Sequence, residues 1–380
     1  MTSPLDSYTA SMGDLHFSDE AKVRMAESLR AAADAKSAEK NVQPSAQSPA
    51  EVLTMPARRP RRHTRHWARV ASGLALALVL GGGGTVAVAA GVLPNPADVL
   101  SDVFGGAPAQ TELLNEVGRP IGASATSNGV TVTAEAVVGD RSNYTVVYSI
   151  EFDDPSVLEG IEPGEDGTLP LVADTTCYIG GVNGGGGGAR FFDADPGDGT
   201  IQYAETMGFS TWNGAGIIGR TMRFWMSEIR AYDAEGGYTT LVTGDWSLKF
   251  EMNYVDTTVD LPAGQETTWQ GAGVTIDAVA VSSVGVTVDY TIDRQIGDLG
   301  PSGQLSDEAQ AKQDAVLGLP VIVAFADGTT FDATNANTHA EEQNDGTSAV
   351  TKTVTYDRII AAGDIVSVIV GDVEIPVSAA

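Results

Sequence analysis

The sequence has very little cysteine, and the part that follows residue 93 has very little histidine. Cys177 is the single cysteine among 380 residues, so no disulfide can form within the chain, and each domain must be held by an apolar core. We expect Cys177 to be a small, buried, apolar residue. His339 is the one histidine after residue 93, so a Ser-His-Asp or Cys-His catalytic site there would have to use it. Because residues 335–346 are polar, we interpret them as a mobile loop that exposes His339.

Positive charge is also scarce after residue 93. Before residue 70 the chain has 11 Lys and Arg against 8 Asp and Glu, a net charge of +3. After residue 93 it has 11 against 42, a net charge of −31, and the two parts together give −28. Nucleic-acid binding needs clustered basic residues that neutralise phosphates. We therefore predict no nucleic-acid partner.

One long stretch, from Val70 to Leu93, has no charged residue. At about 1.5 Å rise per residue, a helix of this length crosses a hydrocarbon layer of roughly 30 Å. We predict a single transmembrane helix within residues 68–93, embedded in the lipid bilayer of the plasma membrane. Arginines are concentrated just before it, which predicts a cytoplasmic N-terminus and an extracytoplasmic C-terminal region. They are Arg58, Arg59, Arg61, Arg62, Arg65 and Arg69.

Two features of this stretch leave an alternative open. The glycines from Gly81 to Gly84 weaken a helix in water, but unpaired backbone groups cost more in lipid, so we expect the helix to persist. Ala87-Val88-Ala89 resembles the cleavage site of a secretory signal. Such signals begin with a short charged region, whereas about seventy residues come first here. We therefore favour an uncleaved membrane anchor.

Residues 1–66 form the predicted cytoplasmic segment. Residues 14–33 are predicted to be an amphipathic helix, and residues 34–66 a disordered basic linker. The helix exposes a predicted partner-binding surface, which consists of Leu15, Phe17, Met25 and Leu29. A helix of this length is marginal in water by itself. It either becomes ordered on binding a partner or remains a transiently helical tail.

Residues 94–120 are predicted to be a helical spacer beside the membrane. Asn95 can cap a helix over 97–104 with Pro96 in its first turn. A second helix is predicted over 111–117 and ends at Gly118.

After the spacer, apolar residues alternate with polar ones, as in strands with one buried face. Two such runs lie between residues 130 and 152, and two more between residues 274 and 292. The sequence GVTVTAEAVV from Gly129 matches GVTIDAVAVS from Gly273. In each half a Gly-Asp pair, which we interpret as a turn, precedes a late strand, at Gly244 and at Gly371. We infer that a whole domain is duplicated.

The length of this repeat indicates the fold class. A unit above about 100 residues is too long for a solenoid repeat or a propeller blade. Strands with one apolar face are best buried by packing sheet on sheet. We therefore predict a mainly β chain with two tandem immunoglobulin-like β-sandwiches outside the membrane, at residues 121–257 and 265–380. A hinge is predicted at residues 261–264.

The acidic run from Asp193 to Gly199 is the best candidate for a metal site. Asp193, Asp195 and Asp198 have the spacing of calcium ligands in a loop. However, Asp198 stands where an EF-hand loop needs glycine, and Glu205 lies one residue beyond the last ligand position. We favour an acidic β-turn over a calcium site.

No other motif indicates chemistry. Gly184 to Gly188 lack the Gly-Lys-Ser/Thr that completes a phosphate-binding loop, so we interpret them as a flexible loop tip. Large aromatic residues are predicted to be core residues, and glycan binding by an exposed pair is the alternative. They are Trp212, Phe224, Trp225 and Trp246. We predict no catalytic residue, no metal site and no cofactor, and therefore no enzyme.

Val103-Phe104 and the later sequence GASATSNGVTVTAEAVVGDRSNYTVVYSIE resemble a family of bacterial membrane proteins called domain of unknown function 4179. The segment LHFSDEAKVRM adds to the likeness, which covers the membrane helix and the first sandwich. The resemblance implies a layout like that of membrane-bound anti-sigma factors. The cytoplasmic segment has no cysteine, so it departs from the zinc-dependent type.

These observations lead to two hypotheses. The first is a single-pass, membrane-anchored signalling protein whose outer region senses or binds an unknown ligand. Its cytoplasmic helix would bind a partner, and the family layout implies an extracytoplasmic-function sigma factor. The second is a cell-surface binding or structural protein that contacts cell-wall polymer or another protein.

Overall fold

The computed structural model describes residues 76–78, 86–88, 93–104, 108–182, 185–196, 198–209, 216–232, 236–299 and 305–377. Backbone contacts divide the chain into residues 1–68 and 69–380, and all described residues belong to the second unit. The described part is mainly β, as predicted.

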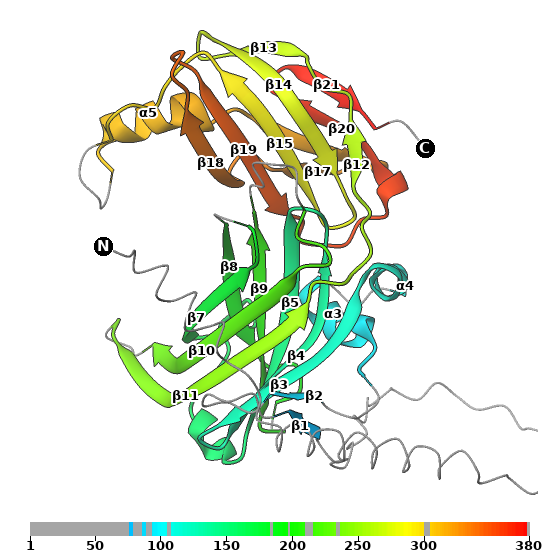
Figure 1. Ribbon diagram of the computed structural model, residues 1–380, viewed down its shortest axis with the longest axis vertical. Coiled ribbons are helices and arrows are strands. Elements are labelled where there is room, and N and C mark those ends of the chain that lie inside the picture. Colours follow the sequence, from blue (N-terminus) through cyan, green and yellow to red (C-terminus); the bar gives the residue numbers. More distant parts are fainter. Residues whose placement is uncertain are drawn as a thin grey trace, which may run out of the picture. The chain divides into compact units, whose positions relative to one another are not determined.

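The first half of the described chain forms two sheets (Figure 1). In the described part of the chain, the larger sheet has eight antiparallel strands in the order β1-β2-β3-β4-β5-β9-β8-β6. They are β1 Leu76–Leu78, β2 Val86–Val88, β3 Arg119–Ser127, β4 Val130–Gly139, β5 Asn143–Phe152, β6 Thr168–Leu169, β8 Gly186–Phe192 and β9 Thr200–Gly208. The smaller sheet has the order β11-β10-β7, with β7 Leu171–Ile179, β10 Thr221–Tyr232 and β11 Tyr238–Glu251. A short 3-10 helix, Pro155–Leu158, follows β5.

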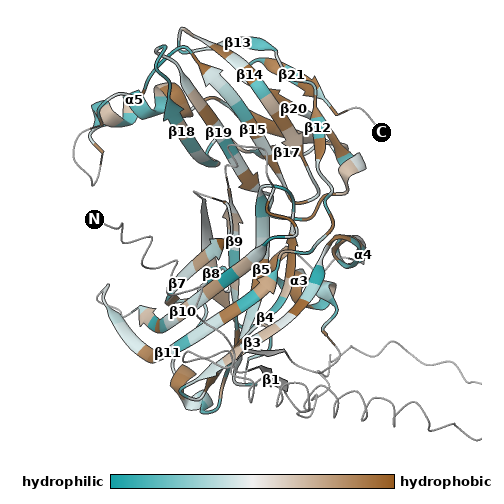
Figure 2. Ribbon diagram, in the orientation of Figure 1, coloured by the Kyte–Doolittle hydropathy of each residue, from teal (hydrophilic) through white to brown (hydrophobic). Residues whose placement is uncertain are grey.

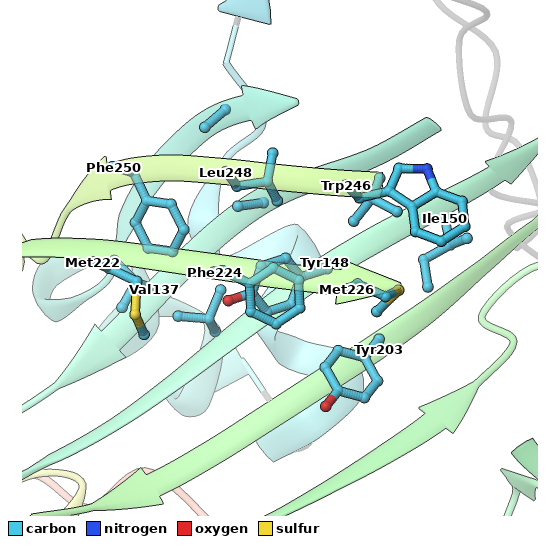
Figure 3. Close-up of a cluster of buried hydrophobic side chains, with 14 of the residues drawn as sticks. Val137, Tyr148, Ile150, Tyr203, Met222, Phe224, Met226, Trp246, Leu248 and Phe250 are labelled. Atoms are coloured by element: carbon cyan, nitrogen blue, oxygen red, sulfur yellow. The ribbon is translucent and has the colours of Figure 1, made fainter. Parts of the chain in front are cut away.

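One apolar core lies between these two sheets, which makes the first half a β-sandwich. Tyr148 of β5 and Phe224 of β10 stack with their ring centroids 4.3 Å apart. The Nε1–H of Trp246 donates a 2.9 Å hydrogen bond to the carbonyl oxygen of Val130, so the indole satisfies its polar group inside the core. Figure 3 shows these rings with Met222, Met226 and other apolar side chains between the strands.

The predicted spacer forms two helices, α3 Pro96–Phe104 and α4 Pro108–Val117. Buried side chains of α3 and α4 pack against apolar side chains of β4, β5 and β9 that point away from the first core. Gly118 directly follows α4, and a Cβ at this position would lie 2.7 Å from the carbonyl oxygen of Leu114, so glycine fits there without a shift of the backbone. The helices therefore form a third layer over the larger sheet.

The second half also consists of two sheets that share one core. One sheet has the order β12-β14-β15-β19-β18, and β13 also pairs with β14. Its strands are β12 Val259–Leu261, β13 Glu266–Trp269, β14 Ala272–Val281, β15 Gly285–Ile292, β18 Asn337–Glu342 and β19 Ser348–Thr355. The other sheet has the order β17-β16-β20-β21, with β16 Val321–Phe325, β17 Thr330–Asp332, β20 Ile365–Val370 and β21 Val373–Pro376. Hydrophobic and hydrophilic residues alternate along these strands, as period-two packing requires (Figure 2).

Two helical segments complete the second sandwich. Helix α5, Asp307–Leu317, begins at Ser306, whose side chain accepts a hydrogen bond from the backbone N–H of Ala309. The hydroxyl of Tyr290 donates a 2.8 Å hydrogen bond to the carbonyl oxygen of Val316, which fixes the end of α5 against the core. A 3-10 helix, Ala362–Asp364, leads into β20.

The matched sequences from Gly129 and Gly273 form the same hairpin in each sandwich. The residue two positions before each hairpin strand has a positive φ, 50° at Asn128 and 46° at Gln270. At the far end of each hairpin, the N–H of Asp153 bonds Gly129 O at 2.8 Å and the N–H of Asp293 bonds Gly273 O at 2.9 Å. These shared contacts support the inferred duplication.

The structure differs from the sequence predictions at two places, the hinge and one of the two Gly-Asp turns. Leu261 lies in β12 and the N–H of Gly264 bonds Ile276 O at 2.7 Å, so residues 261–264 are not a hinge. Residues 252–258, between β11 and β12, connect the two sandwiches instead. Gly244-Asp245 is not a turn but part of β11, at an irregularity in its pairing with β10. The pair at Gly371 is a turn, with φ of 62° at the glycine.

The structure has strands at six residues of the helix predicted from Val70 to Leu93. Leu76–Leu78 and Val86–Val88 are strands that pair with each other, and Val86–Val88 also borders β3. Pairing with a neighbouring strand satisfies their backbone groups without a helix. The other residues from Val70 to Val92 lie outside the described residues. Among the described residues, no helix is both long enough and apolar enough to cross a membrane.

Candidate functional site

The predicted partner-binding side chains cannot be located in the fold. Leu15, Phe17, Met25 and Leu29 lie outside the described residues, as does the whole segment 1–66. The described side chains that could form a site belong to the two sandwiches and the helical layer.

The acidic run after β8 uses its carboxylates in turns. The Asp193 carboxylate accepts a 3.0 Å hydrogen bond from the N–H of Asp195, and the Asp198 carboxylate accepts one of 2.7 Å from the N–H of Thr200. This is the geometry of Asx turns. Within the described ranges, no group of three or more His, Cys, Asp or Glu side chains is placed to share a metal ion. The geometry favours the acidic turn.

Two predicted loops are strands. His339 lies in the edge strand β18, opposite Thr351 of β19, because backbone pairing with β19 outweighs the low strand propensity of a polar segment. Gly186 to Gly188 begin β8. A Cβ on Gly187 would overlap the carbonyl oxygen of Thr206, so glycine allows β8 to approach β9 closely.

The predicted core aromatics divide into two groups. Phe224 and Trp246 are fully buried, as predicted. Trp225 is not a core residue, because strand alternation turns it away from the core and leaves it 36% exposed. Trp212 lies outside the described residues. Cys177 is only partly buried, in β7, where it packs against the first core.

The structure brings together a buried polar cluster that no sequence motif indicated. Asp140 follows β4, and its Oδ1 accepts hydrogen bonds of 2.7 Å from the N–H of Ser142 and of Asn143. Its Oδ2 accepts a 2.6 Å hydrogen bond from the hydroxyl of Ser282, in the turn between β14 and β15. One carboxylate therefore joins a turn of the first sandwich to a turn of the second.

Neighbouring residues extend this cluster in both directions. The hydroxyl of Thr353 in β19 donates a 2.9 Å hydrogen bond to Oδ1 of Asn143. The hydroxyl of Tyr254, in the connecting segment, donates one of 2.9 Å to the carbonyl oxygen of Asp140. The N–H of Ser283 donates one of 2.9 Å to Oγ1 of Thr257 in the same segment. The connection between the sandwiches is therefore fixed to both of them.

Among the described residues, no cation contributes to the charge balance of the Asp140 carboxylate. Burial raises the pKa of Asp140, and the hydrogen bonds from Ser282, Ser142 and Asn143 oppose this shift in part. Arg141 turns instead to two other carboxylates, with N–O distances of 3.4 Å to Asp256 and 2.9 Å to Asp260.

A second connection joins the helical layer to the second sandwich. The side-chain amide of Gln110 in α4 donates a 2.7 Å hydrogen bond to the carbonyl oxygen of Ile359. It also accepts one of 2.9 Å from the N–H of Ile359. Ile359 itself is fully buried in the apolar cluster of α3 and α4, with Val284 of the second sandwich. The layer that follows the uncharged stretch thus contacts both sandwiches.

A hollow of about 590 Å³ lies beside this connection. Glu112, Leu113 and Glu116 of α4 line one side, and Asp327 and Arg358 of the second sandwich line the other. The guanidinium of Arg358 contacts Asp327 at 3.5 Å, so the one cation in the lining is already paired.

Sequence reasoning also missed a buried acid inside the first core. The hydroxyl of Tyr144 donates a 2.6 Å hydrogen bond to Glu205 in β9, and burial raises the pKa of Glu205 to about 7. The signal was available, because Glu205 falls on the same face of its strand as Ile201 and Tyr203.

Comparisons with known proteins give one family. Residues 62–152 match the family model described as Domain of unknown function (DUF4179). Among solved structures, the chain is similar to the crystal structure of the conserved domain protein from Bacillus anthracis, at 15% identity and a TM-score of 0.44, over 67% of this chain and 76% of that chain. No curated protein matches the chain. The match at residues 62–152 supports the resemblance to the DUF4179 family that the sequence indicated.

Proposed function

We propose that this chain is a single-pass, membrane-anchored signalling protein with the layout of an anti-sigma factor. In this proposal, residues 70–93 cross the bilayer, residues 1–66 lie in the cytoplasm, and two immunoglobulin-like sandwiches lie outside. The absence of charge from Val70 to Leu93 and the preceding arginines support this arrangement. In lipid, a helix would replace the few strand pairs of β1 and β2, because it satisfies its own backbone groups.

The observation that carries the proposal is the double hydrogen bond between Gln110 and Ile359. Gln110 belongs to the helical layer that directly follows the proposed anchor, and Ile359 belongs to the second sandwich. A ligand that changed how the sandwiches contact each other would therefore act on this layer. A ligand can shift the sandwiches from one arrangement to another only if it binds the second arrangement more tightly than the first.

The cytoplasmic end of the proposal is tested by deleting residues 14–33 from the full chain. The chain would be expressed with a candidate extracytoplasmic-function sigma factor and a promoter reporter. We expect the intact chain to copurify with the sigma factor and suppress the reporter, and the deletion to abolish both effects. A linker deletion of the same length, residues 37–56, is the matched control. Equal reporter activity in all three strains, without copurification, would reject the proposal.

The alternative is a cell-surface binding or structural protein with an inert tail. The exposed Trp225 on β10 favours it, since exposed aromatic side chains often mark binding surfaces. Under this alternative, surface binding survives the deletion of residues 14–33.

A further inference from the structure

The basic residues after residue 93 are nearly all engaged within the fold. There are eleven, and the structure describes all of them. Nine donate hydrogen bonds to backbone carbonyls or contact carboxylates. They are Arg119, Arg141, Arg190, Arg220, Arg230, Arg294, Lys312, Lys352 and Arg358. Within the described part of the chain, Arg223 and Lys249 have no such partner.

These two cations stand directly opposite each other. Arg223 in β10 pairs in register with Lys249 in β11, and both side chains are exposed on the face away from the first core. Like charges at directly opposite positions destabilise a sheet. The region as a whole has a net charge of −31. Two unpaired cations side by side therefore create a local patch of positive charge that attracts anions.

Aromatic and hydroxyl side chains surround the pair on the same face. Tyr178 in β7 is the other register partner of Arg223 and is 51% exposed. Trp225 lies two residues along β10, with Thr176 and Ser247 as its neighbours in β7 and β11. The faces of aromatic rings are electron-rich and attract the polarised C–H bonds of a sugar ring.

Acidic residues lie on both sides of the surface patch that is formed by Arg223, Lys249, Tyr178, Trp225, Thr176 and Ser247. Glu251 lies two residues beyond Lys249 on the same face of β11. In the other direction, Asp174 and Glu228 contact Arg230 at 2.5 and 3.9 Å, so their charges are partly balanced. The attraction is therefore confined to the row that contains Arg223 and Lys249.

We propose that this face of β7, β10 and β11 binds an anionic polysaccharide. Tyr178 and Trp225 would stack on sugar rings, Arg223 and Lys249 would bind their carboxylate or phosphate groups, and Thr176 and Ser247 would bond hydroxyls. A nucleic acid fits less well, because its charges are much denser than two cations can neutralise against the surrounding acidic surface. The proposal rests on the outer location proposed above, to which it adds a ligand class.

The test measures binding of the full chain, purified in detergent, to polygalacturonate by calorimetry. Methyl-esterified polygalacturonate is the matched ligand, since it has the same backbone without the charge. We expect binding to polygalacturonate that weakens with added salt, and binding to the ester that is at least about tenfold weaker. The double variant R223Q/K249Q and the single variant W225A should each weaken polygalacturonate binding by about tenfold or more.

The melting temperatures of the same variants show whether they still fold. Because R223Q/K249Q removes a repulsion, its melting temperature should not fall below that of the parent chain. Lys312→Gln, on α5, should leave binding unchanged. Equal affinity for both polymers, or binding unaffected by R223Q/K249Q and W225A, would overturn the proposal. A protein retained from the cell envelope through Trp225, with no binding to either polymer, would overturn it as well. None of these readouts depends on membrane topology or on a sigma factor.

Discussion

The hydroxyl of Ser282 donates a 2.6 Å hydrogen bond to Oδ2 of Asp140, across the junction of the two sandwiches. Both residues are almost completely buried. Asp140 occupies the position in its hairpin turn that Ser282 occupies in the matching turn, since each bonds the backbone of the residue three positions later. The duplicated hairpins therefore meet through their equivalent turns.

Removing the Asp140 carboxylate should destabilise the chain strongly. Asp140→Ala removes the acceptor of the N–H groups of Ser142 and Asn143. It also removes the closer acceptor of the Ser282 hydroxyl, whose other acceptor is the carbonyl oxygen of Gly285 at 3.2 Å. Each buried unsatisfied group costs about 1–3 kcal/mol, so we expect the free energy of unfolding to fall by roughly 3 kcal/mol. Denaturant unfolding measures this change.

The exposed Asp245 provides the control, and Asp245→Ala should change the free energy by less than about 0.5 kcal/mol. Calorimetry of Asp140→Ala should also separate the unfolding of the two sandwiches into two transitions. A single transition with unchanged stability would show that the cluster does not join them.

Glu205 should make the stability of the first sandwich depend on pH. Its pKa in the folded chain is about 7, raised from 4.5 by burial. The folded chain therefore binds this proton more tightly than the unfolded chain does. The stabilisation is fully present below pH 4.5 and is lost as the pH rises through 7.

A shift of this size corresponds to roughly 3 kcal/mol between the two ends of that range. The measurement is the free energy of unfolding against pH for the parent chain and for Glu205→Gln, whose amide does not titrate. The difference between the two should favour the parent chain more at about pH 4.5 than at about pH 8. A difference that is constant with pH would contradict the assignment.

The helical layer should depend on Gln110. Gln110→Ala removes two hydrogen bonds to the Ile359 backbone, so we expect a loss of about 1–2 kcal/mol in the free energy of unfolding. Hydrogen exchange at the amide of Ile359 should accelerate in the same variant. Gln310→Ala serves as the control, because the side chain of Gln310 bonds the exposed Asp314 of its own helix. If both variants exchange like the parent chain, Gln110 does not fix the layer.

The sequence predicted those features that local patterns determine. Alternation predicted the hairpins from Gly129 and Gly273, and the Asn95-Pro96 start and Gly118 stop predicted α3 and α4. Patterns failed where tertiary pairing decides. His339 becomes a strand residue through β19, and Gly244 stays within β11 through its pairing with β10.

The candidate site illustrates the same limit. Asp140, Ser282 and Thr353 are distant in sequence, and each resembles an ordinary turn or strand residue until the fold brings them together. Arg223 and Lys249 likewise become significant only once β10 and β11 are in register. Glu205 is different, because it occupies a position of β9 at which the alternation places apolar residues. It can therefore be identified as a buried acid from the sequence alone.

The most direct test of the proposed function labels single cysteines in intact cells with a membrane-impermeant maleimide. In a Cys177→Ser background, Ser227→Cys reports on the exposed face of β10, and Ser45→Cys reports on the segment before the uncharged stretch. The proposal predicts labelling of the Ser227→Cys chain in intact cells, and labelling of the Ser45→Cys chain only after the cells are permeabilised. Labelling of both chains, or of neither, in intact cells would contradict it.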